Sequence, residues 1–195
     1  RFTDSDGTLL ALRPEMTTPA ARLYATSLAA GRQAVKLFYI GQVFRQGPRH
    51  HGLFREFRQA GFEYFGGQSA RADAEVIALA GQALKQLGYN DAVIELGNVA
   101  IVEALLNEHR LTGASRASVI RLLRQKNKSG LVKTGAPKAF IGLLDLDVDL
   151  RAFSAARRLS RDKVFQRSVT DLEKLARRVK RAAKRVLFEF AAVRG

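Results

Sequence analysis

The chain has 195 residues, a hydrophobic fraction of 47% and a formal net charge of +15 at pH 7. A chain of this length buries a sizeable core, and the absence of cysteine excludes a disulfide framework and a cysteine-ligated zinc site. Its apolar runs are shorter than the roughly 20 residues that a membrane span requires, and its first residues do not resemble a secretory signal. We therefore expect a cytoplasmic protein with no membrane contact, no metal site and no cofactor.

The positive charge is unevenly distributed along the chain. Most of it lies from Arg151 onward, and little lies in the first hundred residues. One interpretation is a solvated basic face on helices; the other is a surface for nucleic acid or for an acidic partner protein. Because the chain begins without Met inside a predicted hairpin, we also expect it to be part of a longer protein.

The first thirty residues predict a hairpin and a helix. Residues 2–3 and 8–13 have strand character, and the turn between them ends in Asp-Gly, a strong hairpin signal. Either Thr17 or Thr18 is the predicted N-cap of a helix that ends at Gly31.

Two long strands are predicted next, over residues 35–45 and 54–65, because both segments are rich in aromatic and β-branched residues. The connector between them is short and polar, so antiparallel pairing is expected. Alternation along the second strand places Gln59 and Glu63 on one face. The aromatic side chains of the two strands are predicted to be core residues: Phe38, Tyr39, Phe44, Phe57, Phe62 and Phe65.

The remainder is predicted to be mostly helical. The predicted helices are residues 72–87, 99–107, 114–126, 137–144, 148–159 and 162–185, and the predicted strands are 92–96 and 187–193. The last helix carries apolar residues at helical spacing, opposite a basic face: Val169, Leu172, Ala176, Val179, Ala183 and Val186. The order of the predicted elements is typical of the α+β class. It begins with an antiparallel sheet and covering helices, continues with a helical insertion and returns to the sheet.

Four segments of the first hundred residues carry a family resemblance. Leu12-Arg13-Pro14-Glu15-Met16-Thr17 resembles the Leu-Arg-Pro-Glu-x-Thr element of histidyl-tRNA synthetase and of its paralogue, the regulatory subunit of ATP phosphoribosyltransferase. Residues 36–45 and 52–66 resemble the two strands of motif 2 in class II aminoacyl-tRNA synthetases, and residues 73–77 resemble the start of the helix that follows. The four segments have the order and spacing of the family.

The resemblance implies a fold and a division of the chain. The fold is α+β, with an antiparallel sheet of the class II aminoacyl-tRNA synthetase catalytic-core type, flanking helices and a helical insertion. Residues 1–98 would be the core, residues 99–186 the mostly helical insertion, and residues 187–195 a truncated return to the core sheet.

The resemblance also implies a pocket for a histidine-like ligand, with no catalytic and no metal-binding residue. Glu15 and Thr17 match the pair that holds the α-amino group, and Arg45 matches the arginine that meets a phosphate or carboxylate oxygen. Arg194 matches the first residue of the family's Arg-Gly-Leu-Asp-Tyr-Tyr element. The full set of predicted ligand-binding residues is Glu15, Thr17, Arg45, Arg55, Gln59, Glu63 and Arg194.

The chemistry of these residues fits such a ligand, because an ammonium group needs acceptors and a carboxylate needs arginine or N–H donors. Without the resemblance each has an ordinary explanation. Glu15 would favour a helix N-terminus, Arg45 would be a surface residue at a strand end, and Gln59 and Glu63 would lie on an exposed sheet face.

Three positions depart from the synthetase pattern. The synthetase has an acid where Gly47 stands, a basic residue where Leu53 stands and a histidine where Arg58 stands. Losing the acid and the base beside a triphosphate removes charge complementarity that adenylate formation needs. Residues 93–106 instead resemble the regulatory subunit, with Asn98 in the position of a histidine.

The resemblance therefore implies a regulatory subunit without catalysis of its own, required with a short-form catalytic subunit for the first step of histidine biosynthesis. It implies a homodimer within a hetero-oligomer, with histidine as an effector. One alternative is a histidyl-tRNA synthetase catalytic-domain fragment, which would activate histidine with ATP and charge tRNA. Another is a nucleic-acid-binding module on the basic helices 151–185, against which the lack of interleaved aromatic residues counts.

Overall fold

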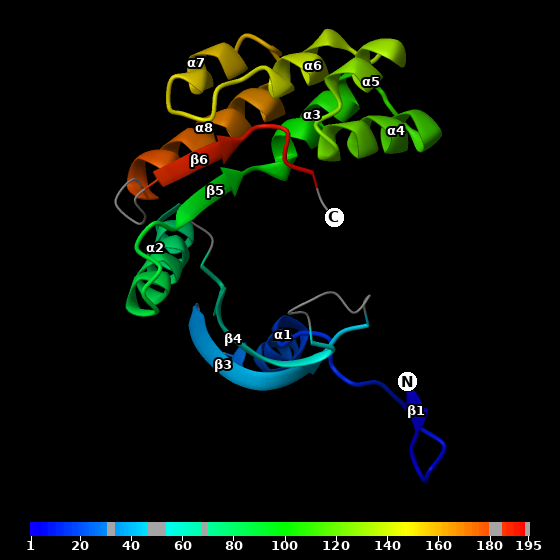
Figure 1. The fold of residues 1–195 in the computed structure, drawn as a ribbon, viewed down its shortest axis with the longest axis vertical. Helices are drawn as coiled ribbons and strands as arrows, with labels where there is room; N and C mark the ends of the chain where they lie inside the picture. The colour runs from blue at the N-terminus through cyan, green and yellow to red at the C-terminus, as the bar shows by residue number, and fades with distance from the viewer. Residues whose placement is uncertain (31–33, 47–53, 68–69, 180–184, 194–195) are drawn as a thin grey trace. The chain divides into compact units, whose positions relative to one another are not determined.

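The computed structural model describes residues 1–30, 34–46, 54–67, 70–179 and 185–193. They belong to two compact units, residues 1–72 and 73–195, whose boundary lies in the first turn of helix α2 (Ala70–Gln86). Figure 1 shows the ribbon of both units, with most of their helices and strands labelled. Within the described ranges, no helix combines the length and the apolar character that a membrane span requires.

The chain begins with the predicted hairpin. β1 (Phe2–Thr3) and β2 (Leu9–Leu10) pair antiparallel. Gly7, in the turn between them, has a φ of +86°, a left-handed conformation that glycine adopts without steric cost. The second strand is shorter than predicted, and Arg13 lies beyond it, where its carbonyl oxygen accepts the amide of Phe44.

β3 (Val35–Phe44) and β4 (Glu56–Phe65) form the antiparallel pair that the sequence predicts. Their register aligns Gly41 with Gln59 and Leu37 with Glu63, so the odd-numbered residues of both strands share one face. The odd-numbered face is half-buried or buried throughout, whereas most even-numbered residues of β3 are exposed.

The helix α1 (Thr17–Leu23), which continues as the π-helix η1 (Tyr24–Leu28), packs on this odd-numbered face. In Figure 1 it lies on the concave side of the β3–β4 ribbon. The Tyr24 ring stacks on Phe65 with 4.5 Å between centroids. Met16 fills the space above Gly41, where an added Cβ would lie 2.9 Å from the methionine sulfur. The glycine therefore permits the close approach of the start of α1.

One of the core residues predicted for this sheet is not buried, so that prediction is wrong. Phe38 is 85% exposed, because strand alternation places it on the even-numbered face, opposite α1. The other five predicted aromatic core residues are half-buried: Tyr39, Phe44, Phe57, Phe62 and Phe65.

The second unit contains most of α2, then β5 (Val93–Gly97). Both were predicted to within two residues. Gly88, at a φ of +88°, follows the last turn of α2. Five helices come next: α3 (Val99–Glu108), α4 (Gly113–Arg124), α5 (Lys128–Lys133), α6 (Lys138–Leu144) and α7 (Ala152–Ala156).

Two of these helices differ from the prediction. α5 was not predicted, although Asn127 is a standard N-cap whose side chain accepts the amide of Gly130 at 2.8 Å. The predicted helix over residues 148–159 is reduced to α7. Asp149 is one reason, because its carboxylate accepts the amide of Arg151 at 2.7 Å in a local turn that competes with helix.

The last two elements are α8 (Lys163–Val179) and β6 (Arg185–Glu189). The predicted helix end at Arg185 is wrong, since this residue begins a strand; the predicted apolar residue Ala183 lies outside the described residues. β6 pairs with β5 in parallel, with Leu96 opposite Phe188. A parallel pair needs a long crossover connection, which the helices between the two strands provide.

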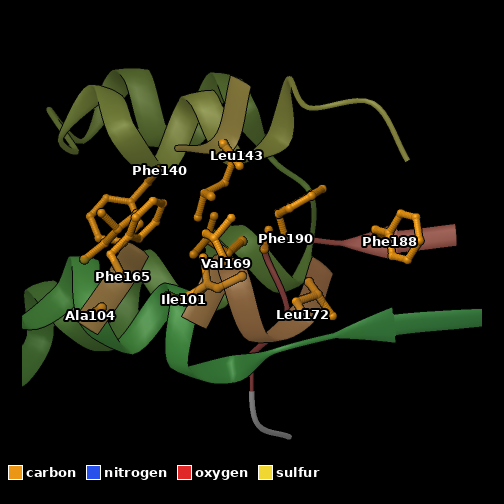
Figure 2. Close-up of a cluster of buried hydrophobic side chains, with 14 of the residues drawn as sticks. Ile101, Ala104, Phe140, Leu143, Phe165, Val169, Leu172, Phe188 and Phe190 are labelled. Carbon is orange, nitrogen blue, oxygen red and sulfur yellow. The ribbon is translucent and has the colours of Figure 1, made fainter. Parts of the chain in front are cut away.

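The core of the second unit lies between α3, α6, α8 and β6. Apolar residues of α8 recur at helical spacing and are buried: Phe165, Val169, Leu172, Ala176 and Val179. Figure 2 shows Phe140 and Leu143 of α6 directed toward this face of α8 and toward Ile101 of α3. Phe153 packs against the ring of Phe188 in β6 and that of Phe190 just after the strand, at 5.2 and 5.1 Å between centroids.

The α+β class is confirmed, with an antiparallel β3–β4 pair and helices grouped mostly after it. The β5–β6 pair adds a parallel sheet that the sequence did not predict. The division into a core, an insertion and a returning strand at residues 98 and 187 stays a prediction.

Candidate functional site

Residues 13–16, between β2 and α1, lie against β3 and β4; we call them the 13–16 segment. The segment is held to both strands by hydrogen bonds, from Phe44 N to Arg13 O (2.9 Å), from Arg45 Nε to Pro14 O (3.0 Å) and from Met16 N to Gln59 Oε1 (3.0 Å). Arg13 Nε also donates to the carbonyl oxygen of Gln42 at 3.0 Å. The segment therefore brings Glu15, Arg45 and Gln59, which are distant in sequence, to one part of the sheet.

Glu15 lies at the beginning of α1. Both of its carboxylate oxygens accept the amide of Thr18, at 2.9 and 3.1 Å. Hydrogen bonds from the Thr18 side chain and backbone, and more weakly from Thr17, hold the pKa of Glu15 below its usual value of 4.5. The prediction that Thr17 or Thr18 caps the helix is wrong: Met16 is the N-cap without a side-chain bond, and Glu15 satisfies an amide of the first turn instead.

Gln59 and Glu63 share the odd-numbered face of β4, as predicted. Gln59 Oε1 accepts the Met16 amide, which fixes the orientation of its carboxamide. Glu63 accepts a hydrogen bond from the Tyr39 hydroxyl at 3.3 Å. The Tyr39 ring lies over Gly61, where an added Cβ would be 2.4 Å from the hydroxyl oxygen. Tyr39, which was predicted to be a core residue, therefore joins the candidate site. It lies opposite Gly61 and on the same face as Glu63, and strand alternation is the signal that could have placed it there.

Arg45 follows the end of β3. Its guanidinium lies 5.2 Å from the centre of the Phe57 ring, within the range of cation–π contact, while its Nε donates to Pro14. Arg55 is exposed, and its carbonyl oxygen accepts the Arg45 amide at 2.8 Å, just before β4 begins. Thr17 is the exposed first residue of α1.

Gly47, Leu53 and Arg194 lie outside the described residues. Arg58 is described, and it pairs with Gln42 on the even-numbered face, away from Gln59. The difference at Arg58 therefore does not bear on the face that carries the predicted pocket.

The described residues around the 13–16 segment combine acceptors and a cation. Carboxylate and carboxamide oxygens come from Glu15 and Gln59, and the guanidinium comes from Arg45. An ammonium group is recognised by such acceptors, and a carboxylate by a guanidinium. In the described part of the chain, no group of three or more His, Cys, Asp or Glu side chains is arranged to hold a metal ion.

A long antiparallel strand pair, crossed by a Glu-bearing segment and followed by a helix, is the arrangement expected of the catalytic-core fold of class II aminoacyl-tRNA synthetases. The comparisons with known proteins agree. The sequence model of the family described as histidyl-tRNA synthetase matches residues 1–195. The chain belongs to this family.

Curated relatives give a narrower similarity. The chain is 37% identical over 151 residues to the ATP phosphoribosyltransferase regulatory subunit of Alkaliphilus metalliredigens (strain QYMF). The aligned region covers 77% of this chain and 37% of the relative. The chain is 32% identical over 192 residues to the subunit of the same name from Synechococcus sp. (strain JA-3-3Ab), covering 96% of this chain and 46% of the relative. The chain thus spans less than half the length of these relatives, and the predicted resemblance to the regulatory subunit is confirmed.

Solved structures support the fold. One described as an ATP phosphoribosyltransferase regulatory subunit/histidyl-tRNA synthetase from Bacillus halodurans C superposes with a TM-score of 0.85 at 32% identity, over 98% of this chain and 52% of that chain. Another, the ATP phosphoribosyl transferase (HisG:HisZ) complex from Thermotoga maritima, has a TM-score of 0.71 at 15% identity, over 97% of this chain and 68% of that chain. At this low identity the second structure supports the fold alone.

Proposed function

We propose that this chain is part of a regulatory subunit of ATP phosphoribosyltransferase, required in the cytoplasm for the first step of histidine biosynthesis and without catalysis of its own. The support is the similarity, at 32% identity and above, to curated subunits of that name. The proposed partner is a short-form catalytic subunit, because the curated relatives are named as regulatory subunits of that enzyme. The regulatory subunit is proposed to act as a homodimer within the hetero-oligomer.

The proposed ligand-binding role rests on one observation, the attachment of the 13–16 segment to β3 and β4. Gln59 is hydrogen-bonded to Met16, which follows Glu15, and Arg45 is hydrogen-bonded to Pro14, which precedes Glu15. The three side chains therefore belong to one short stretch of backbone or contact it. We propose that this site takes histidine, with the α-amino group toward Glu15 and Gln59, and the carboxylate toward Arg45. Glu63, held by Tyr39, offers a carboxylate acceptor for an imidazole N–H farther along the same face. Thr17, Arg55 and Arg194 stay further proposed members of this pocket.

The proposed absence of catalysis is supported by the sequence of the connector between β3 and β4. Gly47 and Leu53 stand where the synthetase pattern has an acid and a basic residue. Adenylate formation develops charge on a triphosphate, and fixed charges beside it supply much of the rate enhancement. A pocket that keeps amino-acid acceptors but lacks these charges would bind histidine without activating it.

Histidine bound in such a pocket would regulate by shifting a conformational equilibrium. A ligand with higher affinity for one state of the complex moves the population toward that state, and a coupling of about 1–3 kcal/mol changes affinity roughly 5- to 150-fold. Feedback inhibition by the product of the pathway needs no more than this.

The proposal is tested with the full-length protein and a short-form catalytic subunit. Formation of phosphoribosyl-ATP from ATP and phosphoribosyl pyrophosphate should require both subunits, and histidine should inhibit it. Glu15→Ala and Gln59→Ala should each weaken histidine binding, measured by calorimetry, roughly 5- to 150-fold, because an ammonium loses one acceptor worth about 1–3 kcal/mol. Unchanged inhibition in both variants would reject this pocket.

Gln42→Ala is the matched control for Gln59→Ala. Gln42 lies on the neighbouring strand but on the even-numbered face, where its side chain donates to Glu56 at 2.7 Å. Its removal should leave histidine binding within about twofold of the parent.

A second candidate function is histidyl-tRNA synthetase activity, which the match of the whole chain to that family favours. The two functions are separated by histidine-dependent exchange of pyrophosphate into ATP. The regulatory proposal predicts no exchange above background, and rapid exchange by the full-length protein would replace it with the synthetase.

A further inference from the structure

The two acceptors of the proposed ammonium site also hold the beginning of α1. Gln59 Oε1 accepts the amide of Met16, the N-cap residue, and Glu15 accepts the amide of Thr18 in the first turn. The first amides of a helix have no partner within the helix, so these two bonds replace an ordinary side-chain cap. Neither Thr17 nor Met16 supplies one.

Both acceptors have capacity for a further donor. A carboxamide oxygen has two lone pairs, and a carboxylate accepts about four hydrogen bonds. The structure uses one N–H on Gln59 Oε1 and the Thr18 donors on Glu15. A primary ammonium can therefore bind the same oxygens without displacing Met16 or Thr18, and it adds charge-assisted bonds to the same network.

We propose that Glu15 and Gln59 are positioning residues that couple the occupancy of the ammonium site to the order of the N-terminal turn of α1. This inference rests on the proposed function, and it adds the route by which the ligand would be sensed. A bound ammonium bridges Glu15 and Gln59, and thereby fixes the two side chains that hold Met16 and Thr18. The site and the helix are thus one hydrogen-bonded unit.

The surroundings of α1 favour such a response. None of the residues of α1 or η1 is buried, so few packing contacts hold this helix independently of its first turn. Short helices gain little stability from their own hydrogen bonds and depend on their environment. Two packing contacts in the described residues are Met16 above Gly41 at one end and Tyr24 on Phe65 farther along. A change at the first turn therefore affects the helix as a whole.

The experiment measures amide hydrogen exchange at Met16 and Thr18 in the full-length protein, without ligand and with saturating histidine. Without ligand, Gln59→Leu should speed exchange at Met16 roughly two- to tenfold, the factor expected from the net loss of one hydrogen bond. Gln59→Glu keeps an acceptor and should restore the slow exchange, whereas Gln42→Leu should not alter it. Unchanged exchange in Gln59→Leu would overturn the role of Gln59.

Histidine should slow exchange at Met16 and Thr18 in the parent protein. The matched probe is 3-(imidazol-4-yl)propionate, which keeps the ring and the carboxylate but lacks the ammonium, and which should leave exchange at both amides unchanged. Histidine that binds by calorimetry without slowing exchange would overturn the coupling and leave the proposed pocket intact. If histidine does not bind while Gln59→Leu still speeds exchange, the proposed pocket fails, and the two residues are helix-capping residues only.

Discussion

The two compact units of the chain bury their side chains to different extents. Among the described residues of the first unit, the buried hydrophobic side chains are Val35, Val43 and Ala72, and the sheet face away from α1 exposes Phe38. The second unit has a continuous core of buried residues from α3, α6, α8 and β6. The first unit instead relies on polar contacts along the 13–16 segment. We infer that stability is concentrated in the second unit and ligand chemistry in the first.

The difference has a physical basis in the two kinds of element. A helix such as α8 buries one apolar stripe against several neighbours, and this burial dominates its stability. The β3–β4 pair has only one face covered by α1, and that face carries Gln59 and Glu63 among its apolar residues. Polar side chains on the covered face of a sheet reduce the free energy gained by burying apolar surface, but they supply hydrogen-bonding groups.

The largest expected effect is in the core of the second unit. Phe140 is fully buried between α3 and α8, so Phe140→Ala should lower the free energy of unfolding by about 3–5 kcal/mol. Phe38→Ala removes the same side chain from an exposed position and should cost less than about 0.5 kcal/mol. Denaturant titration monitored by circular dichroism checks both. Equal losses of unfolding free energy in the two variants would contradict the proposed difference between the units. Such a result would show that the even-numbered sheet face is covered in the full-length protein.

The next effect concerns an ion-pair group of the second unit. Glu173 lies between Arg157 and Arg177, with N–O distances of 2.5 and 2.6 Å, and hydrogen bonds from Arg157 and then Arg177 lower its pKa from 4.5. Glu173→Gln should therefore cost about 1–2 kcal/mol near neutral pH. The pKa is lowered in the folded state, so this stabilisation is present above about pH 4.5 and is lost as the pH falls through the folded value.

Unfolding of the parent and of Glu173→Gln, measured between neutral pH and pH 3, checks the sign. The difference between the two proteins should shrink as the solution is acidified. A difference that grows with acidification would contradict the assignment of the ion pair. Asp171→Asn is the matched control, because the Arg167–Asp171 pair is exposed and its closest N–O distance is 3.8 Å.

A smaller effect is expected in the sheet of the first unit. Gly61→Ala places a Cβ against the Tyr39 ring, at 2.4 Å from the hydroxyl oxygen, and should break the bond from Tyr39 to Glu63. We expect a loss of about 1 kcal/mol, the net value of one hydrogen bond together with modest overpacking. In a Tyr39→Leu background the same change should cost little, and a double-mutant cycle measures the coupling. Additive costs would show that Tyr39 does not occupy this space.

The smallest effect is the titration of Glu15 in the first unit. Hydrogen bonds from Thr18 lower the pKa of Glu15, so the bond to the Thr18 amide should persist above pH 4.5 and break only as the pH falls below that value. The chemical shift of the Thr18 amide, followed by nuclear magnetic resonance, should titrate with a midpoint below 4.5. Glu15→Gln should abolish this transition. A midpoint at or above 4.5 would contradict the capping role of Glu15.

Local sequence signals predicted many of the elements. Asp-Gly indicated the first hairpin, aromatic and β-branched residues indicated β3 and β4, and apolar residues at helical spacing indicated α8. Each of these signals lies within a few residues of the feature that it predicts, because turn geometry, strand alternation and helical periodicity are local properties. In the bounds of the elements, the errors occurred at element ends and in short helices. The start of α5, the extent of α7 and the end of α8 depend on capping and on contacts with distant residues.

By itself, the sequence determined the α+β class, the family resemblance and the candidate residues Glu15, Arg45, Gln59 and Glu63, since order and spacing along the chain are enough for these. Only the tertiary structure decided which of these residues share a backbone segment, that Glu15 holds the start of α1, that Tyr39 donates to Glu63 and that β5 pairs with β6 in parallel. The physical reason is that hydrogen bonds and strand register join residues far apart in sequence. No local periodicity records such partners.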